Sequence, residues 1–375
     1  MENVNLVLFD SYNSGFNAVC ICRPVSEKRG ETAEKAVHMK ISRTFQTIDT
    51  HTGGEPTRTV VGGIPVIPGS TMSEKMIYLR DNYDWIRTML MQEPRGNDVM
   101  SGAILTTPCL PEADIGVIYT EVGCYLPMCG HDTIGVCTAL VETGMVEVHE
   151  PVTRIKLETP AGLIDVTVEV QDGKAKSAAF LNVPSFVMAR DIEVDIAEYG
   201  KVKLDVSYGG NPYAIVAAER FGLVIEPANA KTLIAIAQKI RAAVDEQHPI
   251  QHPDPELSYI NSCTHVEFYG PPTHPEAHCK NAVVILPGAI DRSPCGTGSS
   301  AKLALMYARG EIEPGETFVH ESIVGSLFHC KVVSTTAVAG IPAIIPEIKG
   351  SAYITGMHTF MMDPDDPFKH GFMLM

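Results

Sequence analysis

The chain has 375 residues, of which 45% are apolar and 20% are charged, a balance typical of globular proteins with buried cores. Its formal net charge of −16 argues against nucleic acid or an anionic membrane as a partner. Ten cysteines are too few for a disulfide framework, and no apolar run reaches the roughly 18 residues that a membrane span needs.

Residues 1–38 fit poorly with the rest of the chain. The apolar stretch 6–9 is too short for a signal peptide and lacks a basic leader. We therefore interpret 1–38 as an extension that is disordered or arises from an upstream start site, and we assign no role to Cys20 or Cys22.

Strand and turn patterns begin at Thr44. The expected elements, in chain order, are strands at 45–49 and 59–61 around Gly53-Gly54, a helix from Ser73 to Leu90, and strands at 103–107, 115–119, 155–157 and 163–170. The last strand runs into Gln171-Asp172-Gly173, which predicts a hairpin turn.

The strand-rich pattern restarts near Pro184, where we place a domain boundary. The expected elements are strands at 202–206 and 214–216 around Gly209-Gly210, an amphipathic helix at 231–244, a loop at 248–255, and strands at 264–268 and 282–286. We predict a first domain of residues 39–183 plus about 345–375, and a second domain of residues 184–344.

Two stretches of the chain echo each other. Cys295-Gly296 lies 166 residues after Cys129-Gly130, and Gly310 lies 166 residues after Gly144. Glu158-Thr-Pro-Ala-Gly162 has a partner in Glu321-Ser-Ile-Val-Gly325, 163 residues later. We interpret this as one structural unit used twice, with one cysteine in each copy.

Each cysteine is predicted to stand at the start of a buried helix. The residues after each Cys-Gly pair are apolar on most sides, and Gly144 and Gly310 have the position of a helix-ending glycine. The free N–H groups at a helix start favour a thiolate and a bound anion. Packed core cysteines are the alternative interpretation, but duplication of a core cysteine does not explain the duplicated glycine-rich helix start.

The two cysteine stretches resemble the paired motifs of the proline racemase family. The motifs that carry the resemblance are Met128-Cys-Gly-His-Asp-Thr-Ile-Gly135, Asp291-Arg-Ser-Pro-Cys-Gly-Thr-Gly298, His51-Thr-Gly-Gly-Glu-Pro-Thr-Arg58, Glu93-Pro-Arg-Gly96, Ser351-Ala-Tyr-Ile-Thr-Gly356 and Asp366-Pro-Phe-Lys-His-Gly-Phe372. The resemblance runs from about Met39 to the C-terminus. It implies an α/β (α+β) fold like that of diaminopimelate epimerase, with two pseudo-symmetric domains, each a mostly antiparallel or mixed sheet around a buried central helix.

The resemblance also implies roles for individual residues. Cys129 and Cys295 match the acid/base pair that inverts the substrate α-carbon, so no cofactor is required. Gly130, His131, Gly296 and Thr297 match positions that contact the substrate carboxylate, and Asp291 matches the group that binds the ring nitrogen. The structural alternatives are a loop-capping role for Asp291 and a helix-start role for His131. We expect a small imino acid as the substrate and a homodimer as the assembly. We also expect a cytoplasmic enzyme, because its two thiols need a reducing compartment.

One position departs from the motif. Asp132 stands where the family usually has glycine, asparagine or another small residue. Its carboxylate is expected to raise the pKa of Cys129, unless it points away and caps the helix.

The substrate ring is expected to meet Ser101, Ile285 and His265. Proline-specific members resemble this chain but have aromatic residues at the positions that match Ser101 and Ile285. Serine and histidine offer hydrogen bonds to a ring hydroxyl, so we predict a preference for trans-4-hydroxy-L-proline. Proline racemase activity is the main alternative.

Other functions fit the sequence less well. The related trans-3-hydroxyproline dehydratases have threonine in place of the second cysteine, so Cys295 favours inversion over dehydration. A thiol–disulfide redox protein and a binding protein without catalysis are further alternatives. No metal site is predicted, because His248, His252, His274, His278 and Cys279 match no zinc-binding spacing.

Overall fold

The computed structural model describes residues 41–374, and the predictions for residues 1–38 lie outside the described residues. The described chain folds into a mixed α/β structure that is rich in strands, as predicted. The strands are β1 (Arg43–Thr52), β2 (Glu55–Gly62), β3 (Ser101–Thr106), β4 (Ile115–Glu121), β5 (Tyr125–Leu126), β6 (Val152–Thr159), β7 (Gly162–Gln171), β8 (Lys174–Leu181), β9 (Ser185–Ile196), β10 (Gly200–Tyr208), β11 (Pro212–Ala217), β12 (His265–Gly270), β13 (Cys279–Ile285), β14 (Ala289–Ile290), β15 (Thr317–Glu321), β16 (Leu327–Val338), β17 (Ile341–Gly350) and β18 (Ala352–Met362). The α-helices are α1 (Met72–Met91), α2 (Gly130–Glu142), α3 (Ala230–Gln247) and α4 (Gly296–Ala308), and short 3₁₀ turns lie at 218–221, 227–229 and 255–257.

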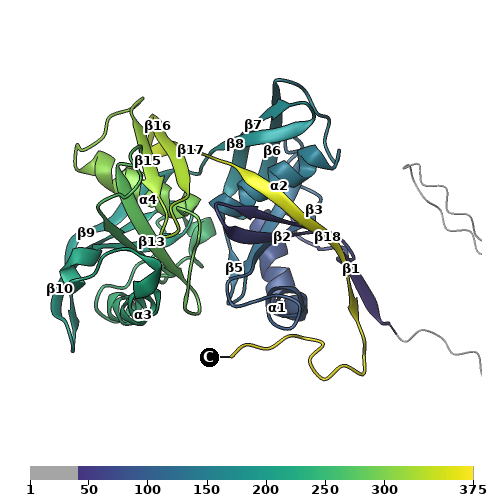
Figure 1. The fold of residues 1–375 in the computed structure, drawn as a ribbon, viewed down its shortest axis with the longest axis horizontal. Helices are drawn as coiled ribbons and strands as arrows, with labels where there is room; N and C mark the ends of the chain where they lie inside the picture. The colour runs from purple at the N-terminus through teal and green to yellow at the C-terminus, as the bar shows by residue number, and fades with distance from the viewer. Residues whose placement is uncertain (1–40, 375) are drawn as a thin grey trace, which may run out of the picture. The chain divides into compact units, whose positions relative to one another are not determined.

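The strands pair in the same order twice. The first strand set runs β18-β1-β2-β3-β4-β6-β7-β8, and the second runs β9-β10-β11-β12-β13-β15-β16-β17. In both sets the third and fifth pairings are parallel and the others are antiparallel. The sets join where β17 pairs with β8 and β9. In Figure 1 the last strand, β18 (yellow), lies beside the first, β1 (purple), so strands from both ends of the described sequence pair in the first strand set.

Two helices are buried and two cover the sheets. All residues of α2 up to Val141 and of α4 up to Leu305 are buried, because both helices are apolar on nearly every side. Helix α2 packs against β1, β2, β8 and β18, and α4 packs against β9, β10, β16 and β17. The predicted buried helices after Cys129 and Cys295 are therefore present.

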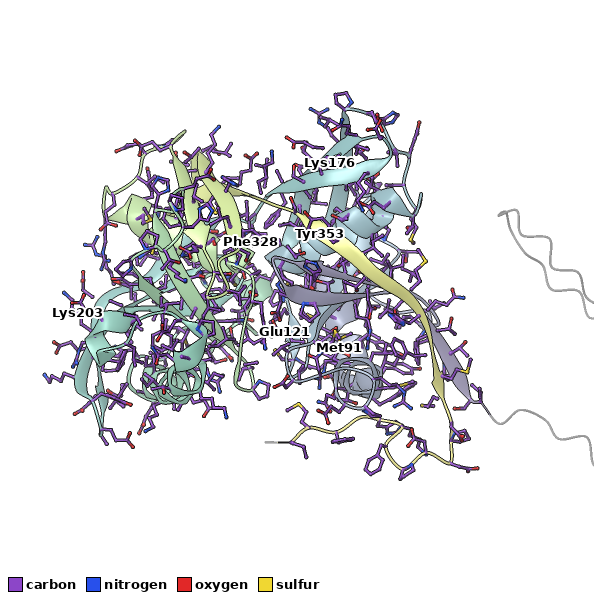
Figure 2. All side chains as sticks on the ribbon, viewed as in Figure 1. Met91, Glu121, Lys176, Lys203, Phe328 and Tyr353 are labelled. Carbon is purple, nitrogen blue, oxygen red and sulfur yellow. The ribbon has the colours of Figure 1, made fainter. Side chains whose placement is uncertain are left out.

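The surface helices also follow from local sequence. Helix α3 buries Leu233, Ile236, Ile240 and Val244 along one face, the stripe that its 3.6-residue period predicts. Helix α1 begins one residue before the predicted Ser73, because Thr71 caps it by accepting a hydrogen bond from the Glu74 amide. Side chains fill the space between helices and sheet, as the buried Met91 and Phe328 illustrate in Figure 2.

The duplicated glutamates occupy equivalent places. Glu158, near the end of β6, accepts hydrogen bonds from the amides of Cys109 and Leu110. Glu321, at the end of β15, accepts hydrogen bonds from the amides of Thr273 and His274. Each glutamate thus hydrogen-bonds the loop before the neighbouring parallel strand, which is β4 for Glu158 and β13 for Glu321. This shared role explains why the sequence echo extends beyond the helices.

The predicted hairpin turn is present, and the chain crosses between the two strand sets twice. Asp172 and Gly173 both have positive φ, at 55° and 69°, the backbone of the predicted two-residue hairpin between β7 and β8. The chain passes from the first strand set to the second between Leu181 and Ser185, and it returns between Gly350 and Ala352. Among residues 41–374, no helix is long and apolar enough to cross a membrane.

Candidate active site

The starts of α2 and α4 touch each other. A β-carbon added to Gly130 would lie 2.5 Å from the Gly296 Cα, and one added to Gly296 would lie 2.7 Å from the Gly130 Cα. Cys129 and Cys295 are the N-cap residues of the two helices, and both are buried. The fold thus brings the two predicted cysteines to one site, with the unpaired N–H groups of both helix starts around it.

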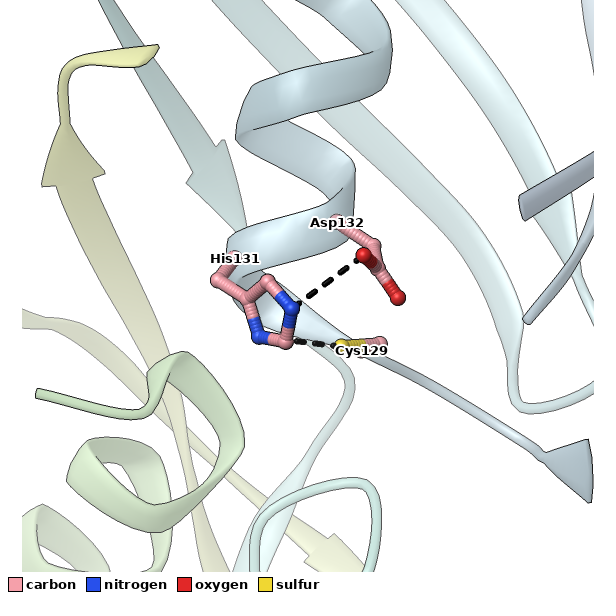
Figure 3. A group of neighbouring side chains, drawn as sticks. All are labelled: Cys129, His131 and Asp132. Atoms are coloured by element: carbon pink, nitrogen blue, oxygen red, sulfur yellow. Dashed lines mark hydrogen bonds and ion pairs between the residues drawn. The ribbon is translucent and has the colours of Figure 1, made fainter. Parts of the chain in front are cut away.

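An imidazole and a carboxylate flank Cys129. His131 Nδ1 lies 3.4 Å from the Cys129 sulfur, and His131 Nε2 lies 3.2 Å from Asp132 Oδ1 (Figure 3). The hydroxyls of Thr57 and Ser101 each donate to one Asp132 oxygen at 2.6 Å. Both Asp132 oxygens thus accept hydrogen bonds from side-chain hydroxyls of neighbouring strands.

Cys129, His131 and Asp132 also have the spacing of a metal-binding group within the described part of the chain. Their arrangement opposes that use, because one ring nitrogen faces the sulfur and the other faces the carboxylate. An ion that used either ring nitrogen would therefore have to displace the sulfur or the carboxylate from its contact with that nitrogen. Of the histidines considered for zinc, His278 accepts the Val319 amide through Nδ1.

Hydroxyls and a carboxylate surround Cys295. Tyr213 Oη lies 3.3 Å from the Cys295 sulfur and 2.5 Å from Thr297 Oγ1. The Asp291 charge adds to burial in raising the pKa of Cys295, and Asp291 Oδ1 accepts the Ser293 amide at 2.7 Å. Cys295 has a positive φ of 62°, unlike Cys129, so its side chain leaves the helix start in a direction that non-glycine residues rarely take.

Burial and charge set the protonation of these groups. Burial raises the pKa of both thiols, and the Asp132 charge adds to this effect at Cys129, as predicted. Burial alone would lower the pKa of His131, but Cys129 and Asp132 hold it well above the ordinary value. Burial likewise opposes ionisation of Asp132, yet His131 and the two hydroxyl donors keep its pKa below the ordinary value. The site therefore contains a buried imidazolium–carboxylate pair.

The two residues that the sequence predicts to meet the substrate ring, Ser101 and His265, occupy equivalent places in the two strand sets. Ser101 begins β3 and pairs with Thr57 of β2, and His265 begins β12 and pairs with Tyr213 of β11. The Ser101 hydroxyl donates to Asp132, while the His265 ring packs on Tyr213 with 4.8 Å between ring centroids. Burial lowers the pKa of His265 to about 3, so its ring is neutral. Ile285 packs in the same buried cluster as Cys295 and Tyr213.

The sequence analysis missed two pairs of site residues. Thr57 and Tyr213 carry equivalent hydroxyls: that of Thr57 donates to Asp132, and that of Tyr213 shares a hydrogen bond with the Thr297 hydroxyl. Glu55 and Asn211 reach across to the opposite set. Glu55 accepts the Arg292 amide at 2.7 Å, and Asn211 donates to the Met128 carbonyl at 2.7 Å, in each case beside the other set's cysteine motif. The available signal was a second repeat, Gly-Gly-x-Pro, at 53–56 and 209–212.

Solved structures share this fold. A hydroxyproline epimerase from Agrobacterium vitis, solved with bound trans-4-hydroxy-L-proline, superposes with a TM-score of 0.85 at 35% identity, covering 90% of this chain and 96% of that one. A probable proline racemase from Agrobacterium radiobacter, solved with bound carbonate, gives a TM-score of 0.84 at 37% identity, covering 88% and 96%. A phenazine biosynthesis protein of the PhzF family from Bacillus anthracis shares the fold alone, at 13% identity and a TM-score of 0.54 over 85% and 99%. The fold is therefore that of the epimerases and their structural relatives.

Sequence relatives narrow this class to one family. The family model described as proline racemase matches residues 47–373. A proline racemase from Clostridioides difficile is 52% identical, covering 90% of this chain and all of that protein. A 4-hydroxyproline 2-epimerase from Streptosporangium roseum is 47% identical with the same coverage. The chain belongs to the proline racemase family, whose members are isomerases.

Proposed function

We propose that this protein is a cofactor-independent isomerase that inverts the α-carbon of a proline-type imino acid, with Cys129 and Cys295 as the acid/base pair. The observation that carries the proposal is the contact between Gly130 and Gly296, which brings the two N-cap cysteines to one site. A substrate carbon held there has one sulfur on each face.

The reaction needs two proton transfers. One thiolate removes the α-proton and becomes a thiol, while the opposite thiol donates its proton to the other face of the carbanion and becomes a thiolate. The N–H groups at both helix starts, including those of Gly130, His131, Gly296 and Thr297, are placed to bind the substrate carboxylate and the negative charge that develops on it. We assign the substrate's secondary ammonium to Asp291, whose buried carboxylate lies beside Cys295.

The repeated strand pairing supports a two-domain interpretation. We propose that the first strand set with α1 and α2 and the second set with α3 and α4 are pseudo-symmetric domains, each built around its buried helix. The substrate would then lie between two equivalent helix starts, which explains why its two faces meet the same kind of group. We also retain a cytoplasmic location and a homodimer as proposals, the latter to be tested by light scattering.

We propose trans-4-hydroxy-L-proline as the preferred substrate, converted to the cis-D epimer. Ser101 and His265 are small or polar side chains at the two equivalent strand starts beside the site. The Ser101 hydroxyl donates a hydrogen bond to Asp132, and its oxygen can still accept one from a ring hydroxyl. His265 Nδ1 is hydrogen-bonded to the Thr264 hydroxyl, so Nε2 is the ring nitrogen available to the substrate. L-Proline is the alternative substrate, as the 52% identity to a proline racemase also allows.

Polarimetry on purified protein tests the proposal. We expect loss of optical rotation with L-proline or a change in rotation with trans-4-hydroxy-L-proline, without any added cofactor. Deuterium from the solvent should appear at the α-carbon of the product. If neither substrate changes while a disulfide between Cys129 and Cys295 supports thiol exchange, the redox alternative replaces this one.

A further inference from the structure

The two catalytic thiols have similar exposure, but different groups contact their sulfur atoms. Cys129 is 4% exposed and Cys295 is 5% exposed, and each caps a buried helix. The nearest ionisable partner of Cys129 is the His131 imidazole at 3.4 Å. At Cys295 the first charged group that affects the thiol is the Asp291 carboxylate, which raises its pKa. A cation favours a thiolate, and a nearby carboxylate favours a thiol.

Asp132 stabilises the cationic form of His131. Its Oδ1 lies 3.2 Å from His131 Nε2, and its two oxygens are held in place by Thr57 and Ser101. The side chain is fully buried, so this charge needs a cation beside it. The imidazole is that cation, and it contacts both the carboxylate and the sulfur (Figure 3).

We propose that Asp132 is a positioning residue that keeps His131 charged, which makes Cys129 the thiolate and Cys295 the thiol of the resting enzyme. This inference rests on the proposed isomerase function and adds a direction to it. In the resting form Cys129 removes the α-proton and Cys295 supplies the new one. After that turnover Cys129 carries the proton and Cys295 is the thiolate, so the opposite stereoisomer is the substrate of the second form.

Asp132 has two opposed effects on Cys129. Its own charge repels a thiolate, while the imidazolium that it stabilises contacts the sulfur directly at 3.4 Å and favours the thiolate. In the proposal, this direct contact outweighs the repulsion. Three further carboxyl groups face His131: Asp291 at 3.9 Å, Glu121 from β4 and Glu55 from the start of β2. Burial raises the pKa of Glu121 to about 8 and that of Glu55 well above the ordinary value. Both groups therefore stay protonated near neutral pH and add no negative charge beside Asp132, His131 and Cys129.

Alkylation of the two thiols tests the proposal without any turnover. Free enzyme is treated with iodoacetamide between pH 6 and 9, and the peptides that contain Cys129 and Cys295 are quantified by mass spectrometry. Because the two exposures are similar and thiolates are the reacting form, we expect Cys129 to react at least about tenfold faster at pH 7, the ratio that one pKa unit produces. Equal rates, or faster reaction at Cys295, would overturn the proposal even if the wild type is an active isomerase.

The variant Asp132→Asn gives the sign of the effect. If Asp132 acts through His131, the Cys129 rate falls about tenfold or more and Asp132→Glu restores much of it. If Asp132 acts on the sulfur directly, the Cys129 rate rises instead, which contradicts the proposal. His131→Gln should lower the Cys129 rate at least as far, and it serves if Asp132→Asn fails to fold. The matched control is Asp165→Asn, which removes an exposed carboxylate on β7 and should leave both rates unchanged.

Discussion

Single buried side chains decide the protonation of this molecule. Glu267, on β12, is fully buried, and no described residue hydrogen-bonds either of its carboxylate oxygens. Burial raises its pKa to about 8, although the Lys302 charge opposes this shift. His320 Nε2 lies 3.7 Å away, and burial lowers the pKa of His320 to about 3, so neither group is charged near neutral pH. Burial also raises the pKa of the Cys129 and Cys295 thiols, but charged groups lie beside both sulfur atoms.

The raised pKa of Glu267 predicts how stability depends on pH. The folded state holds a proton on Glu267 up to about pH 8, while the unfolded chain loses it near pH 4, so stability falls as pH rises through this window. In Glu267→Gln this loss is absent. As pH rises, we expect the free energy of unfolding of the variant to increase relative to that of the wild type by up to about 1.4 kcal/mol per pH unit. Urea unfolding at pH 5, 6.5 and 8 measures it, and parallel pH profiles would contradict the assignment.

Replacing either cysteine should stop inversion. We expect Cys129→Ser and Cys295→Ser each to lower racemisation by about 10³-fold or more, because a hydroxyl is a far weaker acid/base group than a thiol. Each variant should still exchange the α-proton of one stereoisomer with deuterated solvent, through its remaining sulfur. Near-normal racemisation by one variant would show that a single base suffices.

The proposed contact of Ser101 with the substrate ring predicts a change in specificity. Ser101→Phe fills the space beside His131 and Asp132 with an apolar ring and removes the Ser101 hydrogen bond to Asp132. We expect kcat/KM for trans-4-hydroxy-L-proline to fall relative to that for L-proline by about 10²-fold, since a buried hydroxyl without a partner costs about 1–3 kcal/mol. An unchanged ratio, with wild type preferring L-proline, would contradict the proposed substrate.

At the scale of elements, the contact of two helix starts is the central feature. It requires glycine at both positions, because the facing backbone leaves no room for a β-carbon. The Phe180 ring closes the same contact, with Cζ 3.0 Å from the β-carbon position of Gly130 and 3.1 Å from that of Gly296. A change in either glycine therefore acts on the separation of the two thiols.

Gly130→Ala should move the two helix starts, and with them the two thiols, further apart. The new methyl group would meet the Gly296 Cα at 2.5 Å and push the helices apart, and a shift of about 1 Å can cost about 10²-fold in rate. We expect such a loss in kcat, with both thiols still present and a lower melting temperature. Gly270→Ala is the control, since its β-carbon would meet only Ile225 at 3.6 Å. Full activity in Gly130→Ala would mean that the helix contact does not set the site geometry.

The sequence predicted the elements better than the contacts between them. The Cys-Gly echo located both buried helices, and helical periodicity located α3, because these signals are local. The hydrogen bonds from Thr57 and Ser101 to Asp132 span 75 and 31 residues, and local patterns carry no information about them. The roles of Thr57, Tyr213, Glu55 and Asn211 become visible only once the two Gly-Gly-x-Pro turns are superposed.

At the scale of the whole molecule, the two strand sets reach across to each other. Glu55 of the first set holds the Arg292 amide near Cys295, and Asn211 of the second set holds the Met128 carbonyl next to Cys129. Strand β17 completes this exchange by pairing with β8, β9 and β16. Each cysteine is therefore positioned partly by residues of the opposite set, which explains how duplicated units form a single site.

The pairing of β18 with β1 has a consequence for synthesis on the ribosome. Strand β10 finds its neighbour β9 immediately upstream, so this edge of the second set can form as soon as both strands emerge. Strand β1 must wait for residues 352–362, and until then its edge is open to other chains. In a nascent chain stalled after residue 350, hydrogen exchange should find the β10 amides protected and the outer β1 amides unprotected. The equivalent edge pairs of the two strand sets would then form at different times. The β9–β10 pair would form soon after it leaves the ribosome, and the β18–β1 pair only when the chain is nearly complete.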